Sequence, residues 1–347
     1  MRRTTALFLS LLAAASFSFP AAAQEKPWMQ YLNPSAYFQA GYSFETDFNE
    51  RIDNTFYIKR ARLAIQGELY KSAYFGRLEY EVEAELANSP KLLDCWLKYS
   101  IVPEFGIQFG QFKTPLSLEI SECHPLDLEM IDYSLLVRRF VRMSDEDVTG
   151  ISAMGREIGL QFYGDVFKLG RSFSLFRYHV GIFNGNGINR IDDDHLKDFY
   201  ARVMVFPLKD LSISGYYMRR LGFMDEIHIY NDYDYRVRDR YGVAVAYDGK
   251  WGWLRSEYMA GHTDGWRGEG AYVTAGCKFT NRFSVGARCD YFTTNSRQAG
   301  HDQWYYTAGA TWYPLNEHFR IQLNYTYKQE ADRSVSHLVN LMTSIIL

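Results

Sequence analysis

Cysteine is scarce in this sequence, with four residues in 347. Cys277 and Cys289 fall on what we predict to be consecutive antiparallel strands, with about 13 Å of strand between them. That separation exceeds the reach of a disulfide. Cys95 and Cys123 do not have the spacing of a zinc site. We therefore expect four small apolar or free thiol side chains, and neither a disulfide framework nor a cysteine metal site.

Long hydrophobic runs are also missing after the first 23 residues. No later run approaches the about 18 apolar residues that a membrane-spanning helix needs. The mean hydropathy of −0.30 is that of a water-soluble protein. The sequence therefore excludes a protein that crosses a membrane with helices.

Motifs of catalysis and of cofactor binding are absent as well. No HExxH or GxSxG occurs, and the glycine-rich stretch 184–187 lacks the Lys-Ser/Thr of a phosphate-binding P-loop. We interpret 184–187 as a turn and the acidic stretch 192–194 as a solvated loop tip, in preference to a calcium site. No catalytic residue, metal or cofactor is expected.

The first 23 residues have the form of a secretory signal peptide. Arg2 and Arg3 give a positive start, residues 6–19 are apolar, and Ala21 to Ala23 form a small-residue cleavage site. Residues 1–23 are therefore predicted to be a signal peptide, and residues 24–347 a single exported domain.

Aromatic residues are abundant, with 7 Trp, 27 Tyr and 24 Phe, and they follow a period of two. In HFRIQLNYTYK, residues 318–328, every odd position is apolar or aromatic and every even position is polar or charged. A β-strand sends alternate side chains to opposite faces. Residues 270–279, 282–291 and 303–313 show the same alternation. Each segment is therefore predicted to be a strand with one apolar and one water-facing side.

Sixteen such strands are predicted along the chain. They cover about 35–45, 55–70, 73–85, 92–102, 104–112, 156–166, 173–184, 197–206, 210–220, 240–248, 251–261, 270–279, 282–293, 303–313, 317–328 and 336–346. Short and long connections alternate between them, the long ones including 113–155 and 262–269. This pattern predicts an all-β fold, a transmembrane antiparallel up-and-down barrel of the bacterial outer membrane, with an apolar face toward lipid and a polar face toward a lumen.

The aromatic residues of two neighbouring strands support the same interpretation. If the turn at 314–316 pairs Trp312 with Phe319, it also pairs Trp304 with Tyr327. The two pairs then stand about 26 Å apart along the strands. This is close to the height of the apolar band between the two aromatic girdles of an outer-membrane barrel.

The connection 113–155 is the third long loop, and we predict that it folds into the lumen and narrows it. A barrel of about sixteen strands encloses an aqueous channel, and loops of this length are usually functional. An external flap is the alternative.

The predicted water-facing cations are Arg60, Arg62, Arg77, Lys98, Arg177, Arg202, Arg255, Lys278, Arg282, Arg288, Arg320 and Lys328. The acids that face the same way are Glu68, Glu79, Glu81, Glu83, Asp94, Glu157, Asp165, Glu257 and Asp290.

Six segments in order between residues 60 and 207 carry a resemblance to a known family. They are RARLAIQG (60–67), LLDCWLKY (92–99), GQFKTPLSLE (110–119), REIGLQFYG (156–164), VGIFNGNG (180–187) and DFYARVMVFP (198–207). Together they resemble the phosphate-selective porin O and P family of outer-membrane channels. The resemblance implies a sixteen-stranded trimeric channel whose third loop narrows the pore and whose lumenal Arg and Lys side chains attract anions.

The resemblance also implies which residues line the constriction. By motif these are Arg60, Arg62, Asp94 and Lys113, to which the loop adds Arg138, Arg139 and Arg142; the predicted lumenal face adds Arg288 and Arg320. A guanidinium presents a planar fork of N–H groups that suits phosphate, although too tight a grip would stop the flux.

These observations lead to one function and three alternatives. We expect a passive outer-membrane diffusion channel selective for small anions such as phosphate, surrounded by outer-membrane lipid, assembled as a homotrimer and without a nucleic-acid partner. A general, cation-tolerant porin remains open because residues 113–155 carry eight acids and four cations. A barrel enzyme and a purely structural surface barrel also remain open.

Overall fold

The computed structural model describes residues 31–47, 51–72, 74–169, 173–192, 196–221, 238–263, 266–315 and 318–347. The predicted signal peptide, residues 1–23, lies outside these residues, as do Asp193 and Asp194 of the acidic stretch. No helix among the described residues is both long and apolar enough to span a bilayer.

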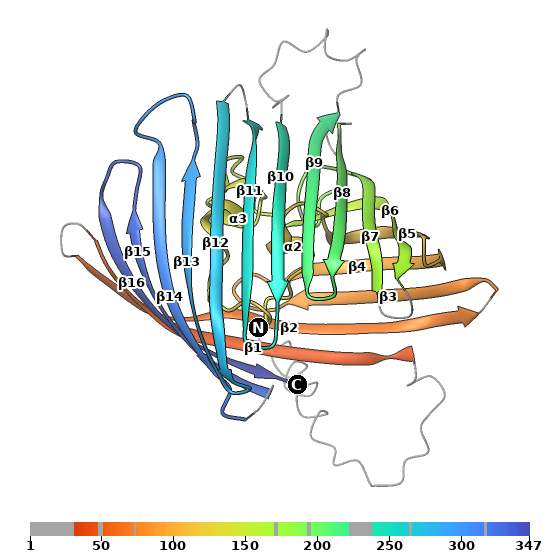
Figure 1. Cartoon of the computed structure of the whole chain (residues 1–347), viewed down its shortest axis with the longest axis horizontal. Coiled ribbons are helices and arrows are strands. Elements are labelled where there is room, and N and C mark those ends of the chain that lie inside the picture. The colour runs from red at the N-terminus through yellow and green to blue at the C-terminus, as the bar shows by residue number, and fades with distance from the viewer. Residues whose placement is uncertain are drawn as a thin grey trace, which may run out of the picture.

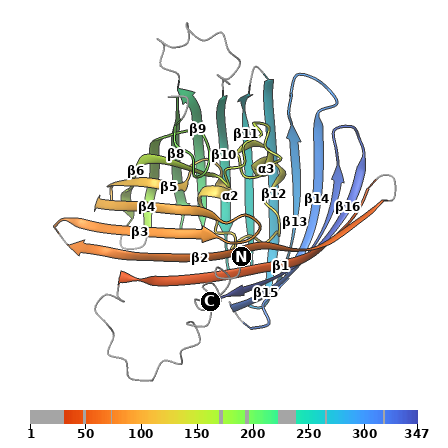
Figure 2. The ribbon, with the colours of Figure 1, turned by 180° about the vertical axis from the view of Figure 1, so that it is seen from behind.

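In the described part of the chain, sixteen antiparallel strands form a closed barrel (Figures 1 and 2). Each strand pairs with its neighbours in sequence, and the last strand pairs with the first, which leaves no open edge. The strands are β1 (Asn33–Thr46), β2 (Ile52–Ser72), β3 (Gly76–Glu85), β4 (Lys91–Val102), β5 (Phe105–Lys113), β6 (Arg156–Leu169), β7 (Phe173–Phe183), β8 (Lys197–Leu208), β9 (Leu211–Leu221), β10 (Arg238–Asp248), β11 (Gly252–Thr263), β12 (Trp266–Thr280), β13 (Phe283–Thr293), β14 (Asp302–Trp312), β15 (Phe319–Gln329) and β16 (Val335–Ile346). The predicted fold class is confirmed.

The alternation in β15 segregates the side chains as the sequence predicts. Leu323 and Tyr325 are 49% and 45% exposed on the outside of the barrel. Gln322 and Asn324, one position away from each, are buried inside at 1% and 4% exposure. Because the closed sheet supplies hydrogen-bond partners for the backbone groups of every strand, the barrel can lie in the hydrocarbon core of a membrane. The apolar face is therefore the outer one, and the polar face lines the lumen.

The predicted pairing between β14 and β15 is wrong by two residues. Trp312 lies opposite Ile321 instead of Phe319, and Tyr306, not Trp304, lies opposite Tyr327. The strands are joined by residues 313–318, a longer connection than the three residues expected. A shift of two leaves each side chain on its predicted face, so the error moves the aromatic pairs along the strand without turning them inward.

A second difference concerns β11 and β12. The sequence predicts a long loop over 262–269, whereas β11 continues to Thr263 and β12 begins at Trp266. Thr263 pairs with Trp266 and His262 with Arg267. Gly268 and Gly270 lie within β12, where they pair with Gly261 and Met259 of β11.

The predicted position of Cys277 is confirmed, since it lies opposite Val285 and four residues from the register position of Cys289. All four cysteines are free.

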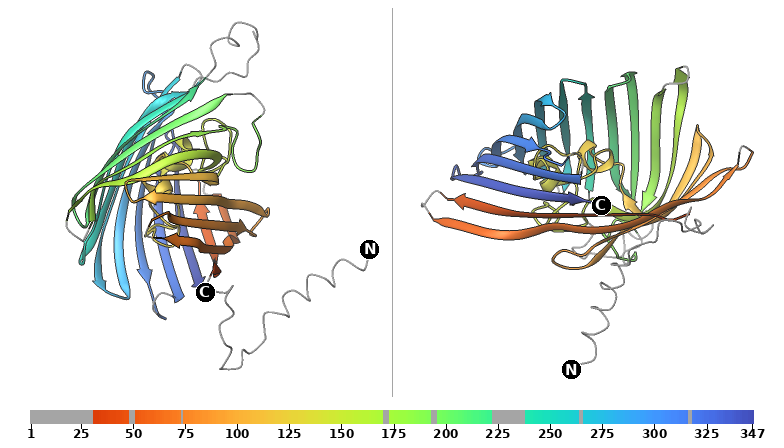
Figure 3. Two further views of the ribbon diagram at one scale, coloured as in Figure 1. Left: turned by 90° about the vertical axis from the view of Figure 1, so that its right-hand side faces the viewer. Right: turned by 90° about the horizontal axis from the view of Figure 1, so that it is seen from below.

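The connection between β5 and β6, residues 114–155, folds inside the barrel wall as predicted. We call it loop 3. It contains two short helices, α2 (Leu118–Ser121) and α3 (Leu135–Phe140). Both lie inside the barrel, surrounded by its strands (Figures 1 and 3). An external flap is excluded.

Candidate functional site

Two buried carboxylates of the barrel wall hold the beginnings of the helices of loop 3. Glu257 of β11 accepts hydrogen bonds from the backbone N–H of Leu118 (3.1 Å) and from Ser117 Oγ (3.0 Å). Asp290 of β13 accepts one from the backbone N–H of Leu135 (2.9 Å). The first N–H groups of a helix have no partner within the helix and attract negative charge. The wall therefore supplies the acceptors that fix both helices.

Apolar packing holds the same loop from the other side. Leu135, Leu136 and Phe140 of α3 are buried together with Phe292 of β13, and the rings of Phe140 and Phe292 meet edge to face at 5.5 Å. The cluster continues along residues 116–143 and includes inward side chains of β5 and of β7 to β14. Burial on this scale removes a large apolar area from water. Loop 3 is thus packed against one side of the lumen.

The acids of loop 3 are matched by cations of the wall. Asp132 pairs with Lys59, and Glu129 pairs with Arg255. Glu122 lies 3.8 Å from Arg177 and 3.9 Å from Arg202. The negative charge of the loop is therefore largely neutralised where it touches the barrel.

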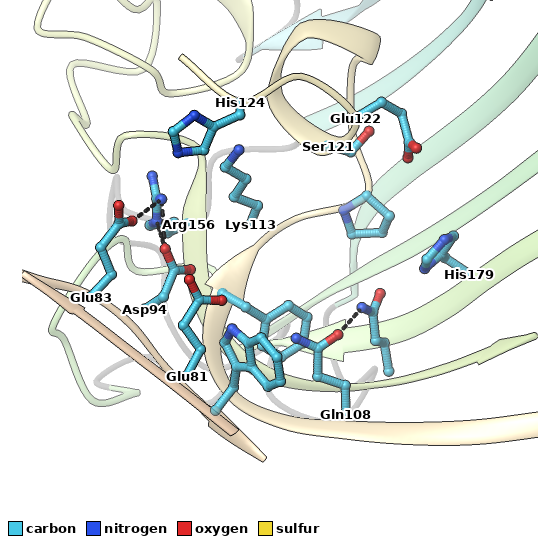
Figure 4. A pocket seen from close by; sticks show the side chains of 14 residues that line it. Glu81, Glu83, Asp94, Gln108, Lys113, Ser121, Glu122, His124, Arg156 and His179 are labelled. Carbon is cyan, nitrogen blue, oxygen red and sulfur yellow. Dashed lines mark hydrogen bonds and ion pairs between the residues drawn. The ribbon is translucent and has the colours of Figure 1, made fainter. Parts of the chain in front are cut away.

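Beside this packing, a cavity of about 280 Å³ lies between the wall and the start of loop 3. We call it the side cavity (Figure 4). Strands β3 to β7 and loop 3 contribute Glu81, Glu83, Asp94, Trp96, Gln108, Phe112, Lys113, Pro115, Ser121, Glu122, His124, Arg156, Gln161 and His179. It is the candidate functional site, because acidic, basic and aromatic side chains meet there around one cavity.

Arg156 is the central cation of this wall. Its Nη2 and Nε atoms lie 2.6 and 2.9 Å from Asp94 Oδ2, and Nη2 also lies 3.0 Å from Glu83 Oε2. Arg156 is only 3% exposed, so the three charges form a buried cluster. Sequence reasoning missed Arg156, since strict alternation from Glu157 would send it outward.

A glycine explains the orientation of Arg156. Gly155 has φ of +70°, which L side chains rarely adopt, and a Cβ there would come within 2.6 Å of Ile120 of α2. The chain therefore turns sharply between loop 3 and β6, and the first residue of the strand points inward. A glycine directly before a strand was the available signal.

Among the described residues, Lys113 of the side cavity and Lys98 of β4 form no ion pair with a carboxylate. Lys113 Nζ donates to the backbone oxygen of Cys123 at 3.0 Å, and Lys98 Nζ lies 4.5 Å from the centre of the Tyr163 ring. Neither forms an ion pair with any described residue. Among the described residues, Glu81 is the cavity acid that forms neither an ion pair nor a hydrogen bond.

Burial, followed by the positive charges of Lys113 and Arg62, lowers the pKa of the loop residue His124 to about 4. The imidazole is therefore neutral at pH 7. The positive side chains around it disfavour the charged form, as burial does.

The structure places the nine predicted site residues in two groups. Asp94 and Lys113 meet at the side cavity, and Arg62 lies beside them, with Nε 2.8 Å from Glu85. Arg60 is buried under the Tyr133 ring of loop 3, 5.6 Å from its centre.

The remaining residues contact loop 3 or belong to it. Arg288 donates to the Asp132 backbone oxygen at 2.7 Å, and Arg320 to that of Leu128 at 3.2 Å. Arg142 ties the loop to Glu157 (2.6 Å). The two remaining loop cations, Arg138 and Arg139, both pair with Glu146.

No group of three or more His, Cys, Asp or Glu side chains suited to a metal ion occurs among the residues described.

Comparison with known proteins gives a family and a set of similar folds. The model of the family described as "Phosphate-selective porin O and P" matches residues 33–167 and 256–344, more than half of the chain. A search of curated protein sequences finds no match.

Among solved structures, an anion-selective porin from Comamonas acidovorans superposes with a TM-score of 0.67 at 11% identity, covering 91% of this chain and 99% of that one. Pseudomonas putida OprB gives a TM-score of 0.69 at 8% identity, covering 92% and 95%. Vibrio cholerae OmpT in its trimer form gives 0.63 at 14% identity, covering 91% and 100%. At these identities the similarity shows the fold.

Proposed function

Because this chain belongs to the phosphate-selective porin O and P family and is an outer-membrane diffusion channel, we propose that it favours small anions such as phosphate. The family and the fold are those of a channel rather than of an enzyme. In this proposal the side cavity is part of the narrow passage that loop 3 leaves open.

The balance of unpaired charge at the passage carries the proposal. Lys98 and Lys113 have no carboxylate partner within the described residues, whereas Glu81 is the single cavity acid without an ion pair or hydrogen bond there. Unpaired charges set the local field, because paired ones largely cancel. Among these described groups without an ion pair, two lysines therefore stand against one glutamate.

The predicted site residues take two roles in this proposal. Lys113 contributes an unpaired charge to the field at the passage. Arg62 and Asp94 lie beside it in ion pairs with Glu85 and Arg156, and Arg60 lies beneath Tyr133. Arg142, Arg288 and Arg320 hold loop 3 in position, and Arg138 and Arg139 stabilise its second half through Glu146.

The first test is a reversal potential in a potassium chloride gradient. Wild-type channels in planar bilayers should give a reversal potential that favours chloride, and added phosphate should reduce the current. Lys113→Gln should lower the chloride-to-potassium permeability ratio by up to about fivefold, since one unscreened charge at contact distance contributes about 1 kcal/mol in water. Lys168→Gln, at an exposed site near a short turn, is the matched control. An unchanged ratio in Lys113→Gln would show that this lysine does not set selectivity.

A cation-tolerant general porin is the second candidate, and a specific observation favours it. Four carboxylates, Glu81, Glu83, Asp94 and Glu122, line the side cavity against the two cations Lys113 and Arg156. If the pairing of these acids is looser in solution, the net field reverses. A reversal potential that favours potassium, without block by phosphate, would establish this candidate.

We also propose that the channel is a homotrimer in the outer membrane. The trimer form of the similar Vibrio cholerae OmpT supports this assembly. The outer face offers exposed apolar side chains such as Phe56, Leu63 and Leu97, which suit either lipid or another protomer. Cross-linking in mild detergent should give a trimer band, and a monomer alone at all cross-linker concentrations would contradict the assembly.

A further inference from the structure

We propose that the side cavity selects small amphoteric solutes, with an acidic group held at Lys113 and an ammonium group held at Glu81 and Trp96. This inference rests on the proposed function, because it names a solute class for the same passage. An anion without an ammonium group would still pass through the channel but would bind more weakly in the side cavity.

Glu81 is the first half of the argument. The other cavity acids are occupied, since Glu83 and Asp94 bind Arg156 and Glu122 lies near Arg177. Glu81 is half-buried and makes no hydrogen bond or ion pair with any residue that the structure describes. A partly desolvated carboxylate without a partner is costly to maintain. A cationic group of a solute would satisfy it.

Trp96 makes the surroundings of Glu81 specific for an ammonium group. In the pairing of β3 with β4, Glu81 lies directly opposite Trp96, and both side chains face the cavity. Figure 4 shows Glu81 on the same side of the cavity as Glu83 and Asp94. The face of an indole attracts cations. A carboxylate and an indole side by side therefore recognise an ammonium group better than either alone.

Lys113 supplies the opposite end of the site. Its ammonium group uses one donor on the Cys123 backbone oxygen and keeps two N–H donors for a ligand. Figure 4 shows Lys113 projecting from the wall into the cavity, beside His124 and above Glu81. An acidic group bound at Lys113 and an ammonium group bound at Glu81 would lie on opposite sides of the same space.

The remaining lining suits a small polar solute. Gln161 is buried, and its Oε1 atom has no partner among the described residues, while its amide nitrogen donates to Gln108 at 2.8 Å. This free acceptor is a further contact for an N–H or O–H group. At about 280 Å³, the cavity admits a solute of a few heavy atoms and not a large one.

The test compares two phosphates as blockers of the chloride current at pH 7. The probes are 2-aminoethyl phosphate and ethyl phosphate, which differ mainly in the ammonium group. Wild-type channels should be blocked at a two- to fivefold lower concentration of 2-aminoethyl phosphate, as expected for a half-buried ion pair. Glu81→Gln should abolish the difference, and block by ethyl phosphate should be at least as strong as in wild type, because an unpaired negative charge is removed from the cavity. Trp96→Leu should reduce the difference.

The matched control is Glu79→Gln, on the same face of β3, because Glu79 is already paired with Arg77 at 3.1 Å. Equal block by the two phosphates in wild type would overturn the inference and leave the anion channel intact. A preference for 2-aminoethyl phosphate that survives Glu81→Gln would equally overturn it. If wild-type channels show neither a preference for chloride nor block by either compound, the proposed function is refuted, and this inference with it.

Discussion

Replacing Arg156 with methionine is expected to lower the free energy of unfolding of the barrel by about 3–5 kcal/mol, since removal of one partner leaves buried charge uncompensated. Asp94 is 5% exposed and forms its one ion pair among the described residues with Arg156. Glu83 retains only the longer contact with Arg62, at 3.7 Å. Denaturant unfolding in detergent micelles, followed by tryptophan fluorescence, measures the loss.

A triple variant separates charge from shape. Arg156→Met combined with Glu83→Gln and Asp94→Asn removes the whole charge cluster, and buried ion clusters can often be replaced by neutral groups at little cost. Most of the lost stability should therefore return. The single variant should also shift the reversal potential toward potassium, because Asp94 then has no ion pair and Glu83 keeps only its long contact with Arg62. A single variant as stable as wild type would show that water, not Arg156, neutralises these acids.

The outward and inward faces of the strands were predictable from the sequence, because the contrast between lipid and water is repeated along each strand. In β15, Leu323 predicts contact with lipid and Asn324 contact with water, and neither prediction depends on the neighbouring strand. Closure of the barrel also followed, since an open edge is not tolerated in hydrocarbon. These are properties of each segment or of the sheet as a whole.

The register was harder to predict because it depends on connections of irregular shape. Trp312 could pair with Phe319 or with Ile321, and both pairings put apolar side chains on the outer face. Only the length of the connection 313–318 decides between them. The alternation of apolar and polar residues excludes a register shift of one residue but allows a shift of two.

The partners of loop 3 were beyond sequence reasoning for a related reason. Glu257 and Asp290 were predicted to face the lumen, and they do, but the strand pattern cannot show that each accepts a hydrogen bond from a loop residue more than a hundred positions away. Arg156 escaped prediction because Gly155 turns the chain just before it. The sequence predicted the residues whose orientation follows from strand alternation. It did not predict those whose orientation or partners depend on the path of loop 3.

Freeing the helices of loop 3 is the second change with a large expected effect. In the double variant Glu257→Ala and Asp290→Ala, Leu118 and Leu135 lose their carboxylate acceptors, and Arg288 loses its ion pair at 2.7 Å. Hydrogen bonds to charged groups contribute about 1.5–3 kcal/mol each. The loop should then sample positions away from the wall. Single-channel recordings should show larger fluctuations of the open current and an altered mean conductance.

The control for the double variant is Asp248→Ala, which removes a carboxylate paired with Lys278 at an exposed site that does not contact loop 3. Its recordings should match wild type. If the double variant also matches wild type, the apolar packing of Leu135, Leu136 and Phe140 holds the loop without the carboxylates. In that case the buried acids would serve only to satisfy backbone N–H groups, and the width of the passage would be set by hydrophobic burial. Larger fluctuations would instead show that the carboxylates on the wall hold the passage at its working width.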